Sequence, residues 1–260
     1  MKNGSAPWRS LACAGLLMSG CLFFPMSLAE DLNGREILDR VEKLLWGKTV
    51  QGDYEMTIRT SRWQRTLSMK MWMERPLRSF VRITAPAKEA GIGSLRIGNE
   101  MWNYLPAVER TIKIPPSMML QPWMGSDFTN DDLVKESSIV NDYTHKASLA
   151  GDMKSDGGDV YRIDSTPKPD AAVVWGKIVN WVRKKDFIPL KEEFYSERGE
   201  LMRVLSFSDV RAVDGRSIPT RWEMRSIVKE GNVTTVLLKD AVFDRPVNAE
   251  IFTQRNLQKR

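Results

Sequence analysis

Alternation of apolar and polar residues at a period of two most limits how this chain can fold. Tyr54, Met56 and Ile58 alternate with Glu55 and Thr57, and the same alternation recurs in many short runs. A period of two predicts β-strands that turn one face to a core. Turn sequences such as Gly98-Asn99 and Asp214-Gly215 separate neighbouring runs, which favours hairpins between them.

The strand-like runs together predict one large antiparallel sheet. They lie at residues 54–59, 67–74, 79–84, 92–97, 100–105, 109–114, 145–151, 159–165, 177–184, 190–196, 201–212, 217–228 and 233–243. Such a sheet must curl or close to avoid long bare edges. No linker or repeat interrupts the pattern, so we expect a single domain that is mainly β with few helices (α+β).

One amphipathic helix is predicted in front of the strands, at residues 33–46. Its apolar residues follow the spacing of a single helical stripe: Ile37, Leu38, Val41, Leu44 and Leu45. Asn33 can cap the first turn, and Gly47 supplies a stop signal. We expect this helix to pack on the sheet.

A long apolar segment interrupts the strands at residues 115–136. Pro115-Pro116 opens it, and Thr129 to Asp132 resemble a cap for a short helix through Lys135. An apolar loop of this length needs something to cover, so we expect it to act as a lid. The candidate lid residues are Met118, Met119, Leu120, Trp123, Met124 and Phe128.

The first thirty residues have the layout of a secretory signal. Lys2 and Arg9 precede an apolar run at 11–24, and small residues precede an acidic start at Glu30. We expect cleavage after Ala29, which leaves residues 30–260 as the mature domain. The run is too short for a spanning helix.

A lipoprotein signal is the alternative interpretation of the same segment. Met18 to Cys21 loosely resembles a lipobox, and acylation at Cys21 would anchor the protein. Both cysteines lie before Glu30, so an exported mature chain would be held by packing without a disulfide. We expect a periplasmic location.

Composition gives little support to several other function classes. The net charge is +6, from 39 basic and 33 acidic residues spread along the chain, so we expect no nucleic-acid partner. The single histidine, His145, stands among polar residues, and we interpret it as a solvated surface residue. No nucleophile-elbow motif is present. We therefore expect no catalytic residues, metal or cofactor.

The chain is instead rich in adaptable apolar side chains, with 14 methionines and 9 tryptophans. Packing of a curved sheet explains them individually, whereas a cavity for acyl chains explains them together with a soft lid. The cavity candidates, chosen because they share strand faces, are Met69, Met71, Met73, Trp102, Tyr104, Trp222 and Met224.

Several segments resemble the outer membrane lipoprotein-sorting protein family, which is related to the periplasmic lipoprotein carriers LolA and LolB. The resemblance lies in GIGSLRIGNEMWNYLP at 91–106, Arg110 to Ile112, GSDFTNDDL at 125–133, DVRAVDGRSIPTRWEM at 209–224, and the ending Ile251 to Leu257. It covers nearly all of residues 30–260. It implies an unclosed, strongly curved antiparallel β-barrel with helices lidding an apolar cavity.

The resemblance also implies a function, that of a carrier for lipid or lipoprotein acyl chains across the periplasm. Relatives in this branch are often associated with inner-membrane exporters of the RND or ABC kind, which implies such a transporter and an outer-membrane acceptor as partners. We expect a monomer. The best-known carrier holds its lid with an arginine, and the resemblance assigns no arginine of this chain to that role.

Two other functions stay open at this point. One is an envelope lipid hydrolase, which the missing nucleophile motif disfavours. The other is an accessory protein of an exporter that binds no lipid itself.

Overall fold

The computed structural model describes residues 33–134, 138–151, 158–171 and 173–259, together with Met1, Met153 and Ser155. The predicted cleavage site at Ala29 and Glu30, the alternative anchor Cys21, and Lys135 lie outside the described residues. All elements below fall within one unit, Leu32–Arg260.

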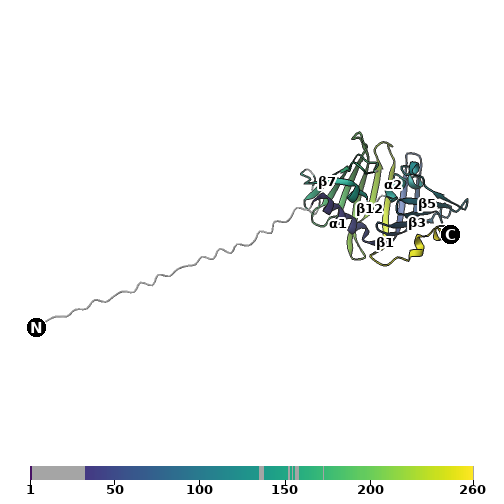
Figure 1. Cartoon of the computed structure of the whole chain (residues 1–260), viewed down its shortest axis with the longest axis horizontal. Coiled ribbons are helices and arrows are strands. Elements are labelled where there is room, and N and C mark those ends of the chain that lie inside the picture. The colour runs from purple at the N-terminus through teal and green to yellow at the C-terminus, as the bar shows by residue number, and fades with distance from the viewer. Residues whose placement is uncertain are drawn as a thin grey trace. The chain divides into compact units, whose positions relative to one another are not determined.

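A 13-stranded antiparallel sheet forms the body of the protein (Figure 1). Its strands are β1 (Thr49–Arg59), β2 (Gln64–Glu74), β3 (Arg78–Ala85), β4 (Gly93–Ile97), β5 (Glu100–Leu105), β6 (Arg110–Lys113), β7 (Tyr143–Leu149), β8 (Val160–Pro167), β9 (Lys177–Arg183), β10 (Pro189–Tyr195), β11 (Leu201–Val213), β12 (Arg216–Ser226) and β13 (Val233–Phe243). Every predicted strand is present, with ends that differ by a few residues.

The strand order shows that the sheet is not closed. It runs β6-β5-β4-β3-β2-β1-β13-β12-β11-β10-β9-β8-β7, so that β1 pairs with β13 in the middle and β6 and β7 are the two edges. Apart from β6 and β7, strands that follow each other in the chain are neighbours in the sheet, as hairpin connections require. The expected unclosed, curved antiparallel sheet is confirmed.

The predicted helix is α1 (Gly34–Trp46), which lies across the sheet in Figure 1. Asn33 and Glu36 form a reciprocal capping box, and Gly47 ends the helix at a φ of +60°, where a side chain would be strained. A Cβ on Gly34 would lie 2.8 Å from the Cβ of His145. This glycine therefore lets the start of the helix approach β7 closely.

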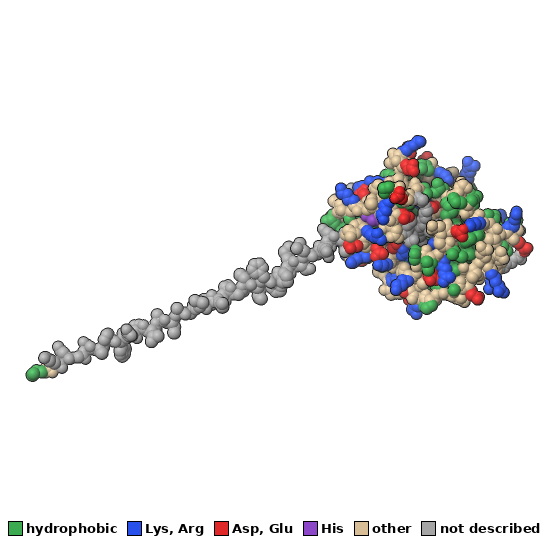
Figure 2. All heavy atoms as spheres, viewed as in Figure 1, with side chains coloured by type: hydrophobic (Ala, Val, Ile, Leu, Met, Phe, Trp, Pro, Cys, Tyr) green, Lys and Arg blue, Asp and Glu red, His purple; other side chains and the backbone are tan. Residues whose placement is uncertain are grey.

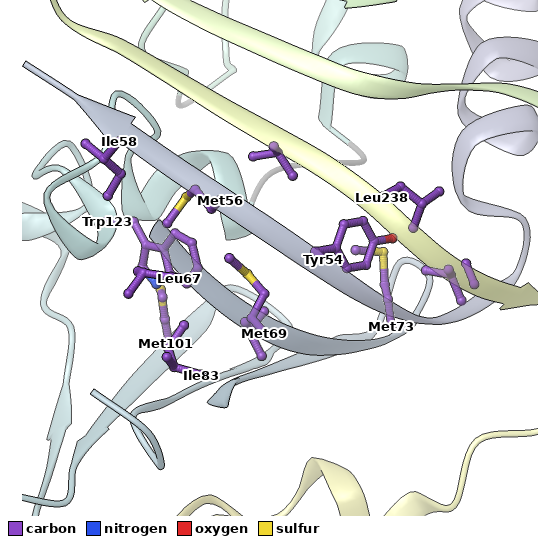
Figure 3. Close-up of a cluster of buried hydrophobic side chains, with 14 of the residues drawn as sticks. Tyr54, Met56, Ile58, Leu67, Met69, Met73, Ile83, Met101, Trp123 and Leu238 are labelled. Carbon is purple, nitrogen blue, oxygen red and sulfur yellow. The ribbon is translucent and has the colours of Figure 1, made fainter. Parts of the chain in front are cut away.

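The inner face of the sheet carries the largest apolar cluster. Tyr54, Met56 and Ile58 of β1 pack beside Leu67, Met69 and Met73 of β2, and all six side chains are at most 6% exposed (Figure 3). The period-two alternation places these residues on one face, as predicted. The other half of the sheet packs against α1 through Tyr161, Ile163 and Val182.

The outer face of β3, β4 and β5 is also covered, which the sequence did not predict. The C-terminal elements η3 (Ala249–Phe252) and α4 (Gln254–Leu257) pack there against Phe80, Leu95 and Tyr104. Trp72 stacks on Phe80 at a centroid distance of 5.7 Å. This second, smaller core lies behind the sheet.

The described residues between the two edge strands form four short helical elements. These are η1 (Pro116–Met118), η2 (Trp123–Gly125), α2 (Asn130–Val134) and α3 (Ser138–Asp142). The predicted helix after Thr129 is α2, whereas α3 and α4 are too short to produce a helical period. No helix in the described part of the chain is long and apolar enough to span a membrane.

Candidate functional site

A cavity of about 250 Å³ lies between the inner face of the sheet and the elements that cover it. Helix α1 contributes Val41, Leu45 and Trp46, whereas the segment 123–133 contributes Trp123, Phe128 and Leu133. Most of the lining is apolar. Both halves of the sheet contribute to the lining.

One wall, which we call the methionine wall, comes from β1, β2 and β5. It consists of Met56, Met69, Met71, Met73 and Met101. Met71 is half-buried, whereas the other four are buried. Flexible thioether side chains adapt to ligands of different shape.

Aromatic side chains continue the methionine wall toward α1. The rings of Trp46 and Trp222 meet edge to face at 5.1 Å, and Tyr54 lies 5.9 Å from Trp222. These contacts join α1 to β1 and β12 across the sheet. They hold the helix side of the cavity in one arrangement.

The segment 123–133, which we call the lid, is fastened to the sheet by side-chain hydrogen bonds. Trp123 Nε1 donates to Ser94 Oγ on β4 at 2.9 Å, and Thr234 Oγ1 on β13 donates to Asp127 Oδ2 at 2.8 Å. Trp123 is 5% exposed and lies beside Leu67 in Figure 3. The lid thus contributes to the core as well as covering the cavity.

Arg203 on β11 makes the strongest of these attachments. Its Nη1 donates to Asp132 Oδ2 at 2.7 Å, a second bond joins Nη2 to Oδ1, and Nη1 reaches the Asp127 carbonyl at 3.3 Å. The guanidinium lies 4.5 Å from the ring centroids of both Trp175 and Phe194. A bidentate pair held between two rings has one favoured geometry.

Arg203 and Asp132 belong to a second wall, which we call the polar wall. It consists of Asp131, Asp132, Glu192 and Arg203. Asn180 on β9 hydrogen-bonds Glu192 on the neighbouring strand β10. Burial raises the pKa of Glu192 to about 7, against the opposing influence of Arg203.

Two other charged groups face the cavity near α1 and β4. Glu42 pairs with Arg75, and burial raises the pKa of Glu42 despite that partner. Arg96 is 5% exposed, and its Nη1 donates to the carbonyls of Pro76 at 2.9 Å and Gly98 at 3.2 Å. Both groups are held by protein partners.

The sequence-predicted site residues separate into four groups. Met69, Met71, Met73, Trp222, Met224, Trp123 and Phe128 line the cavity. Met119 and Met124 pack against the inner core beside it, whereas Met118 and Leu120 are 44% and 52% exposed. Of the predicted lid residues, Met118 and Leu120 therefore do not cover the cavity, because their side chains are exposed to solvent.

The expectation that Trp102 and Tyr104 line the cavity is also wrong. Both residues belong to the cluster behind the sheet, under the C-terminal elements. Their neighbour Met101 faces the cavity instead. The two residues share one face of β5, as the alternation predicts, but that face packs on the C-terminal elements and not on the cavity.

Sequence reasoning missed the charged residues of the polar wall. A signal was present in the sequence. By the period of two, Arg203 lies on the same strand face as Leu205 and Phe207, and Glu192 lies on the same face as Phe194. A charged residue at a core position of a strand is unusual unless it has a partner or a role. The predicted cap at Thr129 to Asp132 is present, since Thr129 N donates to Asp132 Oδ2 at 2.7 Å.

His145 is half-buried and not a solvated surface residue. Its Nδ1 lies 2.9 Å from Ser165 Oγ, and its Nε2 lies 3.4 Å from the Val140 carbonyl oxygen. Burial lowers the pKa of His145. Because Ser165 is fully buried, this Ser–His contact joins β7 to β8 and has no exposed nucleophile.

The exterior shows mixed charge on the face seen in Figure 2. Lys and Arg side chains are interspersed there with Asp and Glu and with apolar atoms. Among the described residues, no group of His, Cys, Asp and Glu side chains has the arrangement of a metal site.

Comparison with known proteins identifies the same fold in three crystal structures. A DUF1329 family protein from Desulfovibrio piger superposes with a TM-score of 0.76 at 24% identity, covering 86% of this chain and 97% of that one. An outer membrane lipoprotein-sorting protein domain from Vibrio parahaemolyticus gives 0.73 at 23% identity, covering 87% and 98%. A LolA superfamily protein from Nitrosomonas europaea gives 0.72 at 23%, covering 86% and 99%.

Sequence comparison assigns the family. No curated protein sequence matches the chain significantly. A family model described as "Uncharacterized protein" matches residues 77–259, which is more than half of the chain. The chain therefore belongs to the family of that model, and its fold is that of the LolA superfamily and of outer membrane lipoprotein-sorting domains.

Proposed function

We propose that this protein is a periplasmic carrier that binds acyl chains of lipids or lipoproteins in its cavity and transfers them between envelope components. The observation that carries the proposal is an apolar cavity with a methionine wall, closed by a lid that attaches to the sheet through polar contacts. Burial of each CH₂ group contributes about 0.8 kcal/mol, so a chain of ordinary length supplies enough affinity.

The size of the cavity suggests how binding proceeds. A cavity of about 250 Å³ exceeds the ~150 Å³ that accepts a benzene-sized ligand, but it is smaller than most pockets for larger ligands. The closed form therefore accepts part of one chain. Longer or multiple chains require the lid to move away from the sheet.

Transfer in this proposal occurs by mass action and involves no covalent step. The donor we propose is an inner-membrane transporter of the RND or ABC kind, and the recipient is an outer-membrane acceptor. The carrier acts as a monomer. The fold shared with a lipoprotein-sorting domain and a LolA superfamily protein supports this assignment.

Binding of an uncharged apolar dye, phenylnaphthylamine, tests the proposal. The wild-type protein should enhance the dye fluorescence, and a long-chain lipid should displace the dye. Met71→Gln should weaken dye binding by roughly tenfold, because it places an amide in the methionine wall. Since Met71 is half-buried, the variant should melt close to the wild type.

Met118→Gln is the matched control, because it makes the same chemical change at an exposed position of the 115–136 segment. It should bind the dye as the wild type does. Absence of dye and lipid binding by the wild type would contradict the proposal and favour the accessory role. Release of free fatty acid from a bound phospholipid would favour the hydrolase.

A further inference from the structure

The polar wall has a hydrogen-bonding capacity that the described part of the protein does not use. Arg203 Nε and Asn180 Oδ1 are buried and have no hydrogen-bond partner among the described residues. Arg203 is 5% exposed and Asn180 2% exposed. Buried polar atoms without partners are rare in native proteins, and Asn180 Oδ1, an acceptor, can take a hydrogen bond from a bound donor.

The charges on the polar wall are also unequal. Asp131, Asp132 and Glu192 face the cavity with Arg203, whose guanidinium already forms a bidentate pair with Asp132. Glu192 has Asn180 as its hydrogen-bond partner, and no ion pair joins it to a cation among the described residues. Its carboxyl group therefore has no direct counter-charge among the described residues.

The two walls line the same cavity and differ in chemistry. The methionine wall is built on β1, β2 and β5, whereas the polar wall is built on β10, β11 and α2. Several strands separate them along the sheet, and its curvature brings them to the same cavity. An amphiphile fits this arrangement if its chain contacts methionine and its head contacts Glu192.

We propose that the polar wall is a head-group subsite, which selects amphiphiles whose head donates hydrogen bonds and carries no net negative charge, such as a protonated long-chain amine. The head would donate to the carboxylate of Glu192 and supply the missing counter-charge. An anionic head would meet three carboxyl groups and one neutralised guanidinium, which is unfavourable. This inference rests on the proposed carrier function and specifies its ligand.

Paired amphiphiles of equal chain length test the subsite. Dodecylamine and dodecanoic acid are titrated against the phenylnaphthylamine complex at about pH 8, where the amine is cationic and the acid anionic. The wild-type protein should bind the amine at least about tenfold more tightly than the acid. Glu192→Gln should abolish most of that preference, with both amphiphile affinities measured against the variant's own dye complex.

Glu193→Gln is the matched control on the same strand. Glu193 faces away from the cavity, where it pairs with Lys191 and accepts from the Tyr195 hydroxyl. This variant loses the same formal charge but should keep the amine preference. Its result separates the local contact from the general electrostatic field.

The outcomes distinguish the two proposals. If the wild type binds the dye and both amphiphiles equally, or prefers the acid, the head-group subsite is wrong and the carrier function stands. A preference for the amine that persists in Glu192→Gln also overturns the subsite. If the wild type binds neither the dye nor any amphiphile, the carrier function and the subsite both fail.

Discussion

Glu192 shows how a single side chain links the chemistry of the cavity to folding. It stands at a strand position that faces the interior, beside apolar Phe194 and Leu205. A carboxyl group in such surroundings is stabilised in its neutral form by burial. Around it, Arg203 on β11 and Asn180 on β9 favour the charged form, whereas Glu42 on α1 and Asp132 on α2 oppose it.

The raised pKa of Glu192 predicts a definite dependence of stability on pH. Its pKa is about 7 in the folded protein against 4.5 for the ordinary group, so between these values the folded state holds more protons than the unfolded state. Stability contributed by the neutral carboxyl is therefore present at low pH and lost as the pH rises toward 7. The loss is on the order of 3 kcal/mol at most.

Urea denaturation of the wild type and Glu192→Gln at about pH 5 and pH 8 measures this effect. The variant stays neutral, so its free energy of unfolding relative to the wild type should increase between the two pH values. Glu193→Gln reports how much of any change comes from loss of a surface charge. An equal difference at both pH values would show that Glu192 is not protonated on folding.

Residue alternation predicted which side chains share a face, but not which face is internal. Met69, Met71 and Met73 share one face and line the cavity, whereas Trp102 and Tyr104 share a face that lies behind the sheet. Both faces of β5 are covered, one by the cavity elements and the other by η3 and α4. When both faces are apolar, a period of two carries no information about direction.

At the scale of elements, the lid is fastened more firmly than an apolar loop would be. Trp123, Asp127 and Asp132 bond to β4, β13 and β11, strands from both halves of the sheet. These contacts join side chains far apart in the sequence, so local patterning could not reveal them. The Met-rich composition predicted a cover, and its polar attachments became visible only in the structure.

Removal of the Arg203–Asp132 pair should release the lid from the sheet. In Asp132→Asn, the buried guanidinium of Arg203 loses its counter-charge, a loss that typically costs about 3–5 kcal/mol at a buried site. Amide hydrogen exchange should then become faster in the lid. One such amide is that of Trp123, whose N–H donates a hydrogen bond to the Phe128 carbonyl oxygen. Amides in the β1–β13 pairing should exchange as in the wild type.

Asp39→Asn provides the control for this prediction. Asp39 pairs with Lys43 on the exposed side of α1, and an exposed pair of this kind contributes only about 0.3–0.5 kcal/mol. Lid exchange in this variant should match the wild type. Unchanged lid exchange in Asp132→Asn would mean that packing of Trp123 alone holds the lid.

At the scale of the whole molecule, the pairing of β1 with β13 determines the architecture. It joins strands from the two ends of the folded unit and leaves β6 and β7 as edges. The chain that connects these two edge strands contains the lid. Hairpin signals predicted the neighbours along the chain. They could not predict the pairing of β1 with β13, because it depends on contacts between residues nearly two hundred positions apart, such as Val50 and Phe243.

A carrier that shuttles between membranes must be free of a permanent anchor, which makes its processing the last prediction. We propose that the signal segment is cleaved after Ala29, so intact-mass measurement of protein from the cell envelope should give a chain beginning at Glu30 with no added lipid. The folded unit begins only a few residues later, since Asn33 caps α1. A cleaved chain would therefore keep every described helix and strand.

The alternative gives a different mass and a different mode of action. Acylation at Cys21 would leave a lipid-modified terminus about a dozen residues before α1, a tether that spans at most about 40 Å when extended. Cys21→Ser serves as the control, because it should not change the mature mass if cleavage follows Ala29. The opposite result is a lipid-modified wild type that loses its modification in Cys21→Ser. That result would contradict a carrier that diffuses across the periplasm, and it would favour transfer at one membrane.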